Sequence, residues 1–215
     1  MSSSDLSEMK EFAQNRALGY ALFADLFFQE ANEAFVERLR ESALAGADDA
    51  AFFAEPLVGL NMQEAVSQLR SEYAALFLAM SATPVFTSES AYLSSSNCLM
   101  QEQRDQVVRA YRAEGFEVSE DFRQPEDHIA VELSFMSRLC ALAASSAERG
   151  DDAMFLEYTA KQKEFYQTHI ARWIPLFCQL VQDHPKASFF RPVACRLDGF
   201  LAMEASLLDE ALLPA

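Results

Sequence analysis

The residues with the clearest potential for chemistry lie in one short stretch, from Gln124 to His128. Pro125 favours the first turn of a helix, because its ring fixes φ and it has no N–H to leave unpaired. Asp127 at this helix start could accept hydrogen bonds from free backbone N–H groups. His128 and Glu132 share a helical face, so the carboxylate could orient or charge the imidazole. The stretch is therefore either a ligand site or a well-capped helix start with a solvated His–Glu pair.

Motifs for nucleotide or metal chemistry are missing from the chain. It contains no GxxxxGK[ST] loop, no GxGxxG, no HExxH and no ExxH pair of the di-iron type. The three histidines, His128, His169 and His184, are scattered. We therefore expect no catalytic residue, no metal site and no cofactor, and we interpret the chain as a non-enzyme that binds another protein.

A second feature is an aromatic stripe that runs into a long connection at about 81–96. This connection is rich in Ser, Thr and Pro, and connections of such length are usually functional or mobile. Together the aromatic stripe and this connection could form the walls of an apolar groove that binds a peptide helix. The residues concerned are Tyr73, Leu76, Phe77, Phe86 and Tyr92. The alternative is that the stripe belongs to the core, as helical aromatics usually do.

Apolar residues recur at helical spacing along most of the chain. The expected helices are at about 5–30, 32–45, 61–80, 97–114 and 127–150, then from 151, and at the C-terminal end. Irregular connections are expected at about 81–96, 115–126 and 184–192. Leu18 and Leu22 belong to a wide apolar face of the first helix, Asn61 can cap the third, and Pro175 should kink a later one. With no convincing strand pair, the sequence predicts an all-α, bundle-like single domain over 1–215.

The chain is strongly acidic, with a formal net charge of −16 over 215 residues. Such a surface repels phosphate backbones and anionic lipid, so we expect no nucleic-acid partner and no membrane-surface partner. It would attract a basic partner, such as an arginine-bearing peptide. The alternative is that the charge only keeps an apolar-rich protein soluble.

The sequence also predicts a cytoplasmic location. The first residues lack the basic start and apolar core of a secretory signal. The most apolar stretch, Ala17 to Phe28, contains Asp25 and is shorter than the roughly 20 residues that a membrane span needs. The four cysteines form no CxxC pair, and we expect them to be reduced thiols that fill the core.

Several ordered pieces of the sequence resemble the TorD/DmsD/NarJ family at similar spacing. They are Glu72-Tyr73-x-x-Leu76-Phe77, then Pro84 together with Ser90-x-Tyr92, then Glu120-x-x-x-Gln124-Pro125-x-Asp127-His128-Ile129-x-x-Glu132-Leu133, then Phe165-x-x-x-His169-Ile170-x-x-Trp173-x-Pro175-x-Phe177, and finally Phe189-Phe190 to Glu204. The resemblance covers about residues 10–210. Each piece alone is weak, whereas five ordered pieces are fairly specific.

The resemblance implies an all-helical cytoplasmic chaperone for molybdenum-cofactor oxidoreductases. Such a chaperone binds the twin-arginine leader of the catalytic subunit and delays export until the molybdopterin cofactor is in place. The predicted peptide-binding residues are Tyr73, Leu76, Phe77, Pro84, Phe86, Ser90, Tyr92, Glu120, Gln124, Pro125, Asp127, His128 and Glu132. In this interpretation the aromatic residues wall the groove, and the polar residues lie at its edge.

One position departs from the family pattern ExxxEPxDH. Glu120, Pro125, Asp127 and His128 match it, but Gln124 stands where the family has a second Glu. The change removes one negative charge and leaves the Pro-led helix start intact. Any role that needs a carboxylate at this position is therefore in doubt.

Two other functions stay open from the sequence. One is a nucleotide-binding or nucleotide-hydrolysing switch that uses Asp127, His128 and Glu132, since weak guanine-nucleotide binding has been proposed within the family. The other is an assembly factor for a membrane-bound nitrate reductase-like complex, as in the NarJ branch. The sequence identifies neither the client nor its substrate. The protein could be a monomer or a dimer that exchanges helices.

Overall fold

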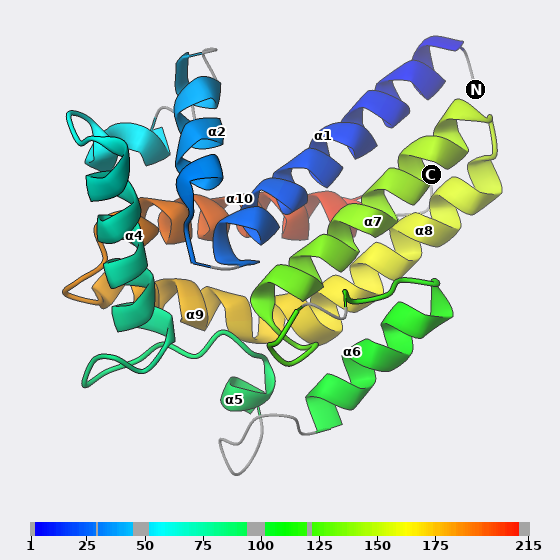
Figure 1. Cartoon of the computed structure of the whole chain (residues 1–215). Helices are drawn as coiled ribbons and strands as arrows, with labels where there is room; N and C mark the ends of the chain where they lie inside the picture. Colours follow the sequence, from blue (N-terminus) through cyan, green and yellow to red (C-terminus); the bar gives the residue numbers. More distant parts are fainter. Residues whose placement is uncertain (1–2, 29, 45–51, 94–101, 120–121, 211–215) are drawn as a thin grey trace. The chain divides into compact units, whose positions relative to one another are not determined.

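A computed structural model describes residues 3–28, 30–44, 52–93, 102–119 and 122–210. The regular elements in these ranges are helices, and Ser88 and His128 form an isolated antiparallel bridge. The predicted all-α fold is therefore confirmed. In chain order the elements are α1 (Ser3–Phe28), α2 (Glu33–Leu44), η1 (Glu55–Leu57), α4 (Met62–Phe77), α5 (Ser90–Leu93), α6 (Glu102–Ala113), α7 (Ile129–Glu148), α8 (Asp152–Phe165), η2 (Tyr166–Ile170), α9 (Ala171–Asp183) and α10 (Phe190–Glu210) (Figure 1).

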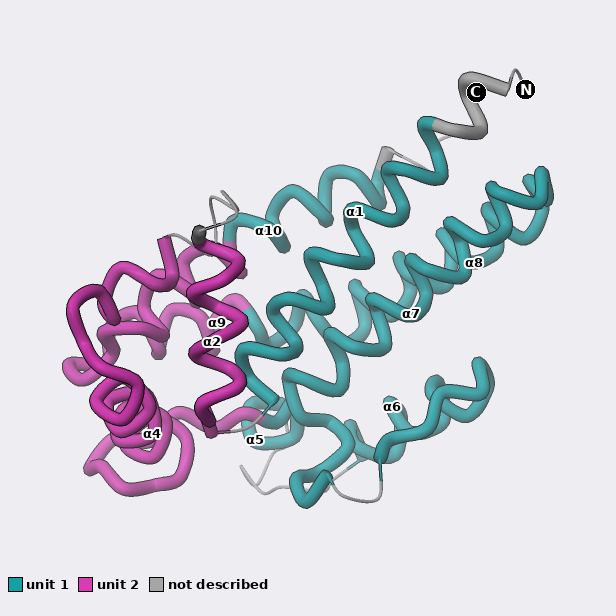
Figure 2. The backbone as a smooth tube through the Cα atoms, turned by 45° about the horizontal axis from the view of Figure 1, so that its top comes forward, with its two compact units in different colours: residues 1–28, 88–174, 199–215 teal, residues 29–87, 175–198 magenta. Residues whose placement is uncertain are grey.

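The chain divides into two compact units (Figure 2). Unit 1 consists of Met1–Phe28, Ser88–Ile174 and Gly199–Ala215, and unit 2 consists of Gln29–Thr87 and Pro175–Asp198. Helices α9 and α10 contribute residues to both units. The single domain expected over the whole chain stays a prediction.

In unit 1, α7 packs against both α1 and α8 (Figure 1). Small side chains allow α1 and α7 to approach closely, because Ala13, Ala143 and Ala144 form one buried cluster. The Ser137 hydroxyl of α7 donates to the Ala17 carbonyl oxygen of α1 at 2.8 Å. Packing and this hydrogen bond together hold α7, whose N-terminal end carries the predicted site.

Helix α7 is apolar along most of its length. Among the described helices it is the one long and apolar enough to cross a membrane, with a mean hydropathy of 1.3 over its most apolar window. However, 67% of that window is buried inside the protein. Since buried core helices of soluble proteins meet the same criteria, we interpret α7 as a core helix.

In unit 2, helix α4 begins with the cap that the sequence predicts. The Asn61 side chain accepts a hydrogen bond from the Glu64 backbone N–H at 3.0 Å. The Glu64 carboxylate accepts one from the Asn61 N–H at 2.9 Å. This reciprocal pair satisfies two N–H groups that the helix start would leave free. Near the other end of α4, the rings of Tyr73 and Phe77 pack edge-on against Phe190, at centroid distances of 6.0 and 5.0 Å.

A π-helical turn, η2, separates α8 from α9 and carries His169. The sequence places a kink at Pro175, which lies inside α9. The departure from α-helical hydrogen bonding comes earlier, at Tyr166–Ile170. Turns of this kind accommodate an extra residue within a helix and occur frequently at functional sites.

Two expectations about buried side chains are wrong. Leu18 and Leu22 of α1 are exposed, Leu18 by 68%, although both belong to the expected core face. Helix α1 is apolar around more of its circumference than its neighbours cover, so periodicity alone cannot select the buried side. Cys195 is also exposed, whereas Cys140 and Cys178 are buried free thiols. Cys98 lies outside the described residues.

Two of the three expected connections are shorter than predicted. Helix α5 occupies Ser90–Leu93, within the connection expected at 81–96. The connection expected at 184–192 ends before Phe190, where α10 begins. The described part of 115–126 is non-helical, as expected.

Candidate functional site

The helix start at Gln124–His128 is capped differently from the prediction. Helix α7 begins at Ile129, and its cap is His128, whose Nδ1 accepts a hydrogen bond from the Ala130 N–H at 3.2 Å. The Asp127 carboxylate instead accepts one from the Ser90 N–H at 2.8 Å. Asp127 therefore caps the short helix α5, and it ties the segment before α5 to the segment before α7.

The polar residues of this region are buried, which corrects the expectation of an exposed helix end. Asp127 and Glu132 are fully buried, and His128 is 1% exposed. Glu132 Oε2 accepts a hydrogen bond from Trp173 Nε1 at 3.0 Å, and within the described chain its carboxylate makes no hydrogen bond to His128. The solvated His–Glu pair that the sequence suggested is therefore wrong.

Three carboxylates meet in the interior of unit 1: Glu89, Asp127 and Glu132, each 0% exposed. Burial raises the pKa of Glu132 well above its ordinary value, and the negative charges of Glu89 and Asp127 raise it further. One oxygen of each carboxylate has no hydrogen-bond partner among the described residues. A carboxyl group that retains its proton relieves the repulsion within such a cluster, and Glu132 is the member whose pKa is raised.

Glu89 also orients a histidine. Its Oε2 lies 2.9 Å from Nδ1 of His169, on the π-helical turn η2. Tyr92 of α5 packs its ring against Trp173 at a centroid distance of 5.2 Å. Sequence reasoning missed Glu89, because no local pattern links it to a residue 80 positions away.

The remaining residues of the motif lie closer to solvent. Gln124 is exposed and Pro125 is half-buried. Glu126, which is not among the predicted peptide-binding residues, forms a two-pronged pair with the Arg104 guanidinium, with N–O distances of 2.7 and 2.6 Å. The hydrogen bonds from Arg104 lower the pKa of Glu126. Glu120 lies outside the described residues.

The predicted groove residues fall in both units. Within unit 2, Tyr73 and Leu76 are buried in the core, so neither can contact a peptide without local opening. Phe77 and Pro84 are half-buried, whereas Phe86 is 52% exposed. In unit 1, Ser90 is buried and Tyr92 is half-buried. The groove itself therefore stays a prediction.

Unit 2 also exposes large apolar side chains that are not among the predicted groove residues. They include Leu78, Met80, Leu176 and Leu180. Leu176 and Leu180 are four residues apart on α9 and therefore share a face. Exposed apolar side chains of this kind are a common feature of protein-binding surfaces when they are contiguous.

The buried His128 predicts a loss of stability in mild acid. Burial lowers its pKa to about 3, against an ordinary value of 6.5. The folded protein keeps His128 neutral, so only the unfolded state takes up this proton as the pH falls below 6.5. The stabilisation is full above that pH and declines as the pH falls towards 3. The expected loss between pH 7 and pH 4 is about 3 kcal/mol in the free energy of unfolding.

Urea unfolding of the wild type and His128→Asn at several pH values measures this contribution. Asparagine can still cap the helix but does not titrate. Glu132 works in the opposite direction, since its raised pKa gives stability that is full below pH 4.5 and lost at higher pH. Both proteins share that term, so their difference isolates His128. Identical pH dependence in the two proteins would contradict a neutral buried imidazole.

Comparison with known proteins identifies the class of protein to which this fold and this motif belong. A family model described as "Nitrate reductase delta subunit" matches residues 28–179. Because the match covers more than half of the chain, the protein belongs to this family, the TorD/NarJ family that the ordered motifs predicted.

Similarity to curated relatives extends over nearly the whole chain. A relative from Vibrio parahaemolyticus named "Chaperone protein TorD" is 25% identical over 94% of this chain and 99% of its own length. Relatives with the same name come from an El Tor strain of Vibrio cholerae (25% identical, 95% of this chain and 97% of their own) and from Shewanella pealeana (24% identical, 92% and 85%). Chaperones do not catalyse a reaction, so these names agree with the prediction that the protein is not an enzyme.

Proposed function

We propose that this protein is a system-specific cytoplasmic chaperone for a molybdenum-cofactor oxidoreductase. It binds the twin-arginine leader of the catalytic subunit, the apo form of that subunit, or both, and it assists cofactor insertion before export. The observation that carries the proposal is the near full-length similarity to proteins named chaperone TorD. The family match and the order of the motifs along the chain support it.

The chemistry of a twin-arginine leader suits this chain. The leader is a cationic segment followed by an apolar helix. A net charge of −16 would speed the encounter with the arginines. The exposed apolar side chains of unit 2, among them Phe86, Met80 and Leu176, could take the apolar helix. Binding of this kind combines a salt-sensitive step with a salt-insensitive one.

Titration of the chain with a synthetic leader at low and high salt tests this mechanism. We expect the association rate to fall at least several-fold as the salt concentration rises, because exposed charges are screened. Phe86→Ser should weaken binding several-fold, whereas Val58→Ser, at another exposed apolar site of unit 2, should leave it unchanged. A leader that binds equally fast at both salt concentrations would contradict the proposal that charge attraction speeds the encounter.

The second candidate is assembly of a membrane-bound nitrate reductase-like complex. The description of the matching family, which names a nitrate reductase subunit, favours it. The client that co-purifies from the native cell separates the two candidates. A client without a twin-arginine leader would exclude the export role and support the assembly role.

A nucleotide switch at Asp127 and His128 receives less support from the geometry. Both side chains are buried, and both accept hydrogen bonds from backbone N–H groups. Hydrolysis of nucleotide that disappears in both Asp127→Asn and His128→Ala would nevertheless establish it.

A further inference from the structure

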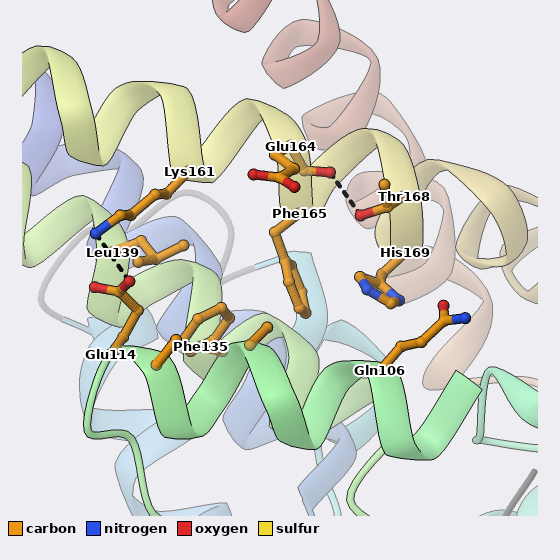
Figure 3. Close-up of a pocket in the computed structure, with 11 residues that line it drawn as sticks. Gln106, Glu114, Phe135, Leu139, Lys161, Glu164, Phe165, Thr168 and His169 are labelled. Carbon is orange, nitrogen blue, oxygen red and sulfur yellow. Dashed lines mark hydrogen bonds and ion pairs between the residues drawn. The ribbon is translucent and has the colours of Figure 1, made fainter. Parts of the chain in front are cut away.

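Unit 1 contains a pocket that the proposed function leaves unused. It has a volume of about 410 Å³ and lies between α6, α7, α8 and η2 (Figure 3). This volume lies within the range of pockets that bind small ligands. The apolar part of its lining consists of Ala110, Ala113, Phe135, Leu139 and Phe165. An apolar or aliphatic group would therefore lose little on entering it.

The hydrogen-bond donors of the polar lining are already engaged. Lys161 pairs with Glu114 at 2.9 Å and with Glu157 at 2.8 Å. The Thr168 hydroxyl donates to the Glu164 carbonyl oxygen at 2.6 Å, as Figure 3 shows. The side-chain amide nitrogen of Gln106 donates to Glu102 at 3.1 Å. A ligand that needs donors from the protein would find few in this pocket.

Two acceptors of the lining are free. In the described chain, the Glu164 carboxylate and the Gln106 amide oxygen receive no hydrogen bond. His169 is 6% exposed and points with Phe165 from the α8–η2 segment towards α6 (Figure 3). Its Nδ1 lies 2.9 Å from Oε2 of Glu89, and a carboxylate can only accept, so Nδ1 carries a hydrogen. The other nitrogen, Nε2, is not engaged by Glu89.

The charges around the pocket favour a cation. Glu114 and Glu164 outnumber Lys161 in the lining. Arg172, one turn beyond Thr168, donates to the Thr168 carbonyl oxygen at 3.4 Å and does not line the pocket. A phosphate-bearing ligand would be repelled by Glu114 and Glu164, and Lys161 in the lining is already paired with carboxylates. A cation rich in donors, with an apolar stem, matches both the charge and the unused hydrogen-bonding atoms.

We propose that this pocket binds an arginine side chain presented by a partner polypeptide. A guanidinium carries five donors in a plane and stacks on aromatic rings, so it suits a lining that combines aromatic rings with the free oxygens of Glu164 and Gln106. Its aliphatic stem packs against Phe135 and Phe165. The identification of the partner as a twin-arginine leader rests on the proposed function. The chemistry of the pocket does not depend on it.

An NMR titration with N-acetylarginine methylamide tests the pocket directly. The citrulline analogue, which has the same shape and no charge, is the matched ligand control. We expect shifts of the His169 and Thr168 signals with the arginine compound, and an affinity about tenfold lower for citrulline, since a charged hydrogen bond is lost. Equal affinity for the two compounds, or shifts confined to residues outside the pocket, would overturn the proposal.

Three variants separate a specific site from general attraction to an acidic protein. Glu164→Gln removes a charge within the lining, whereas Asp152→Asn removes one from the exposed first turn of the same helix. Gln106→Leu removes an acceptor without a change of charge. We expect roughly tenfold weaker binding of the arginine compound by Glu164→Gln and weaker binding by Gln106→Leu, with no change for Asp152→Asn. Equal losses of affinity for the arginine compound in Glu164→Gln and Asp152→Asn would overturn the proposal that the pocket is the binding site.

The leader peptide distinguishes this proposal from the proposed function. A leader that binds the wild type and both pocket variants equally well would overturn the pocket and leave the chaperone role intact. The arginine compound could bind in the pocket while the leader peptide does not bind the protein at all. That result would support the proposed arginine site and count against leader binding.

Discussion

Replacement of Arg16 by alanine should lower the free energy of unfolding by about 3–5 kcal/mol, because it leaves a buried charge without its partner. The Arg16 guanidinium of α1 is 8% exposed and donates to both oxygens of Glu204 on α10, with N–O distances between 2.6 and 3.1 Å. Its remaining terminal nitrogen donates to Gln162 on α8 at 2.7 Å. The substitution therefore strands Glu204 in the interior and frees a buried amide. Urea unfolding followed by far-UV circular dichroism measures the change.

An exposed ion pair on the same helix provides the control. Lys10 of α1 pairs with Glu148, whose side chain is 61% exposed. Solvent screens such a pair, so Lys10→Ala should change stability little. The double substitution Arg16→Met and Glu204→Met should recover much of the loss, since it removes both buried charges and keeps apolar volume. A double variant as unstable as Arg16→Ala would show that packing, rather than charge, sets the cost.

Replacement of Glu72 by alanine should cost about 3–5 kcal/mol, since each buried N–H left unpaired costs about 1–3 kcal/mol. The carboxylate of Glu72, on α4, accepts hydrogen bonds from the N–H groups of Ser188, Phe189 and Phe190 at 2.8, 3.1 and 2.8 Å. It thus caps the N-terminus of α10 from another helix, where a negative charge is favoured. The side chain is 6% exposed, so water cannot replace it without a local rearrangement.

The variant Glu72→Gln tests this explanation. Glutamine keeps the shape and one acceptor oxygen but places an amide nitrogen against the donors. We expect a loss of stability clearly smaller than that of Glu72→Ala, measured by the same urea unfolding. A Glu72→Ala variant within about 0.5 kcal/mol of the wild type would contradict the capping role, because ordinary surface substitutions produce effects of that size.

The sequence predicts helices well where the signal is local. The reciprocal cap of Asn61 and Glu64 follows from residues three positions apart, and the structure confirms it. The buried side of α1 could not be predicted in the same way. Leu18 and Leu22 fit the apolar period as well as Phe23 and Phe27 do, and only the neighbouring helices decide which of them is covered.

For the candidate site too, only the features that depend on residues close in sequence could be predicted. Its location before α7 could be predicted from Pro125 and the polar residues around it. The exchange of roles between Asp127 and His128 could not, because it depends on α5, which lies 37 residues earlier in the chain. The pairs Glu89–His169 and Glu132–Trp173 also join residues remote in sequence. Local spacing alone predicted that His128 and Glu132 form a solvated pair. The fold buries both side chains.

Maturation of the client in the native cell tests the chaperone role most directly. The measurement is the molybdenum-cofactor content of the client enzyme, purified from cells with and without the gene for this chain. We predict that the client from cells without the gene carries much less cofactor, and that the wild-type gene restores it. A client with full cofactor content and normal export in the absence of this chain would contradict the proposed function.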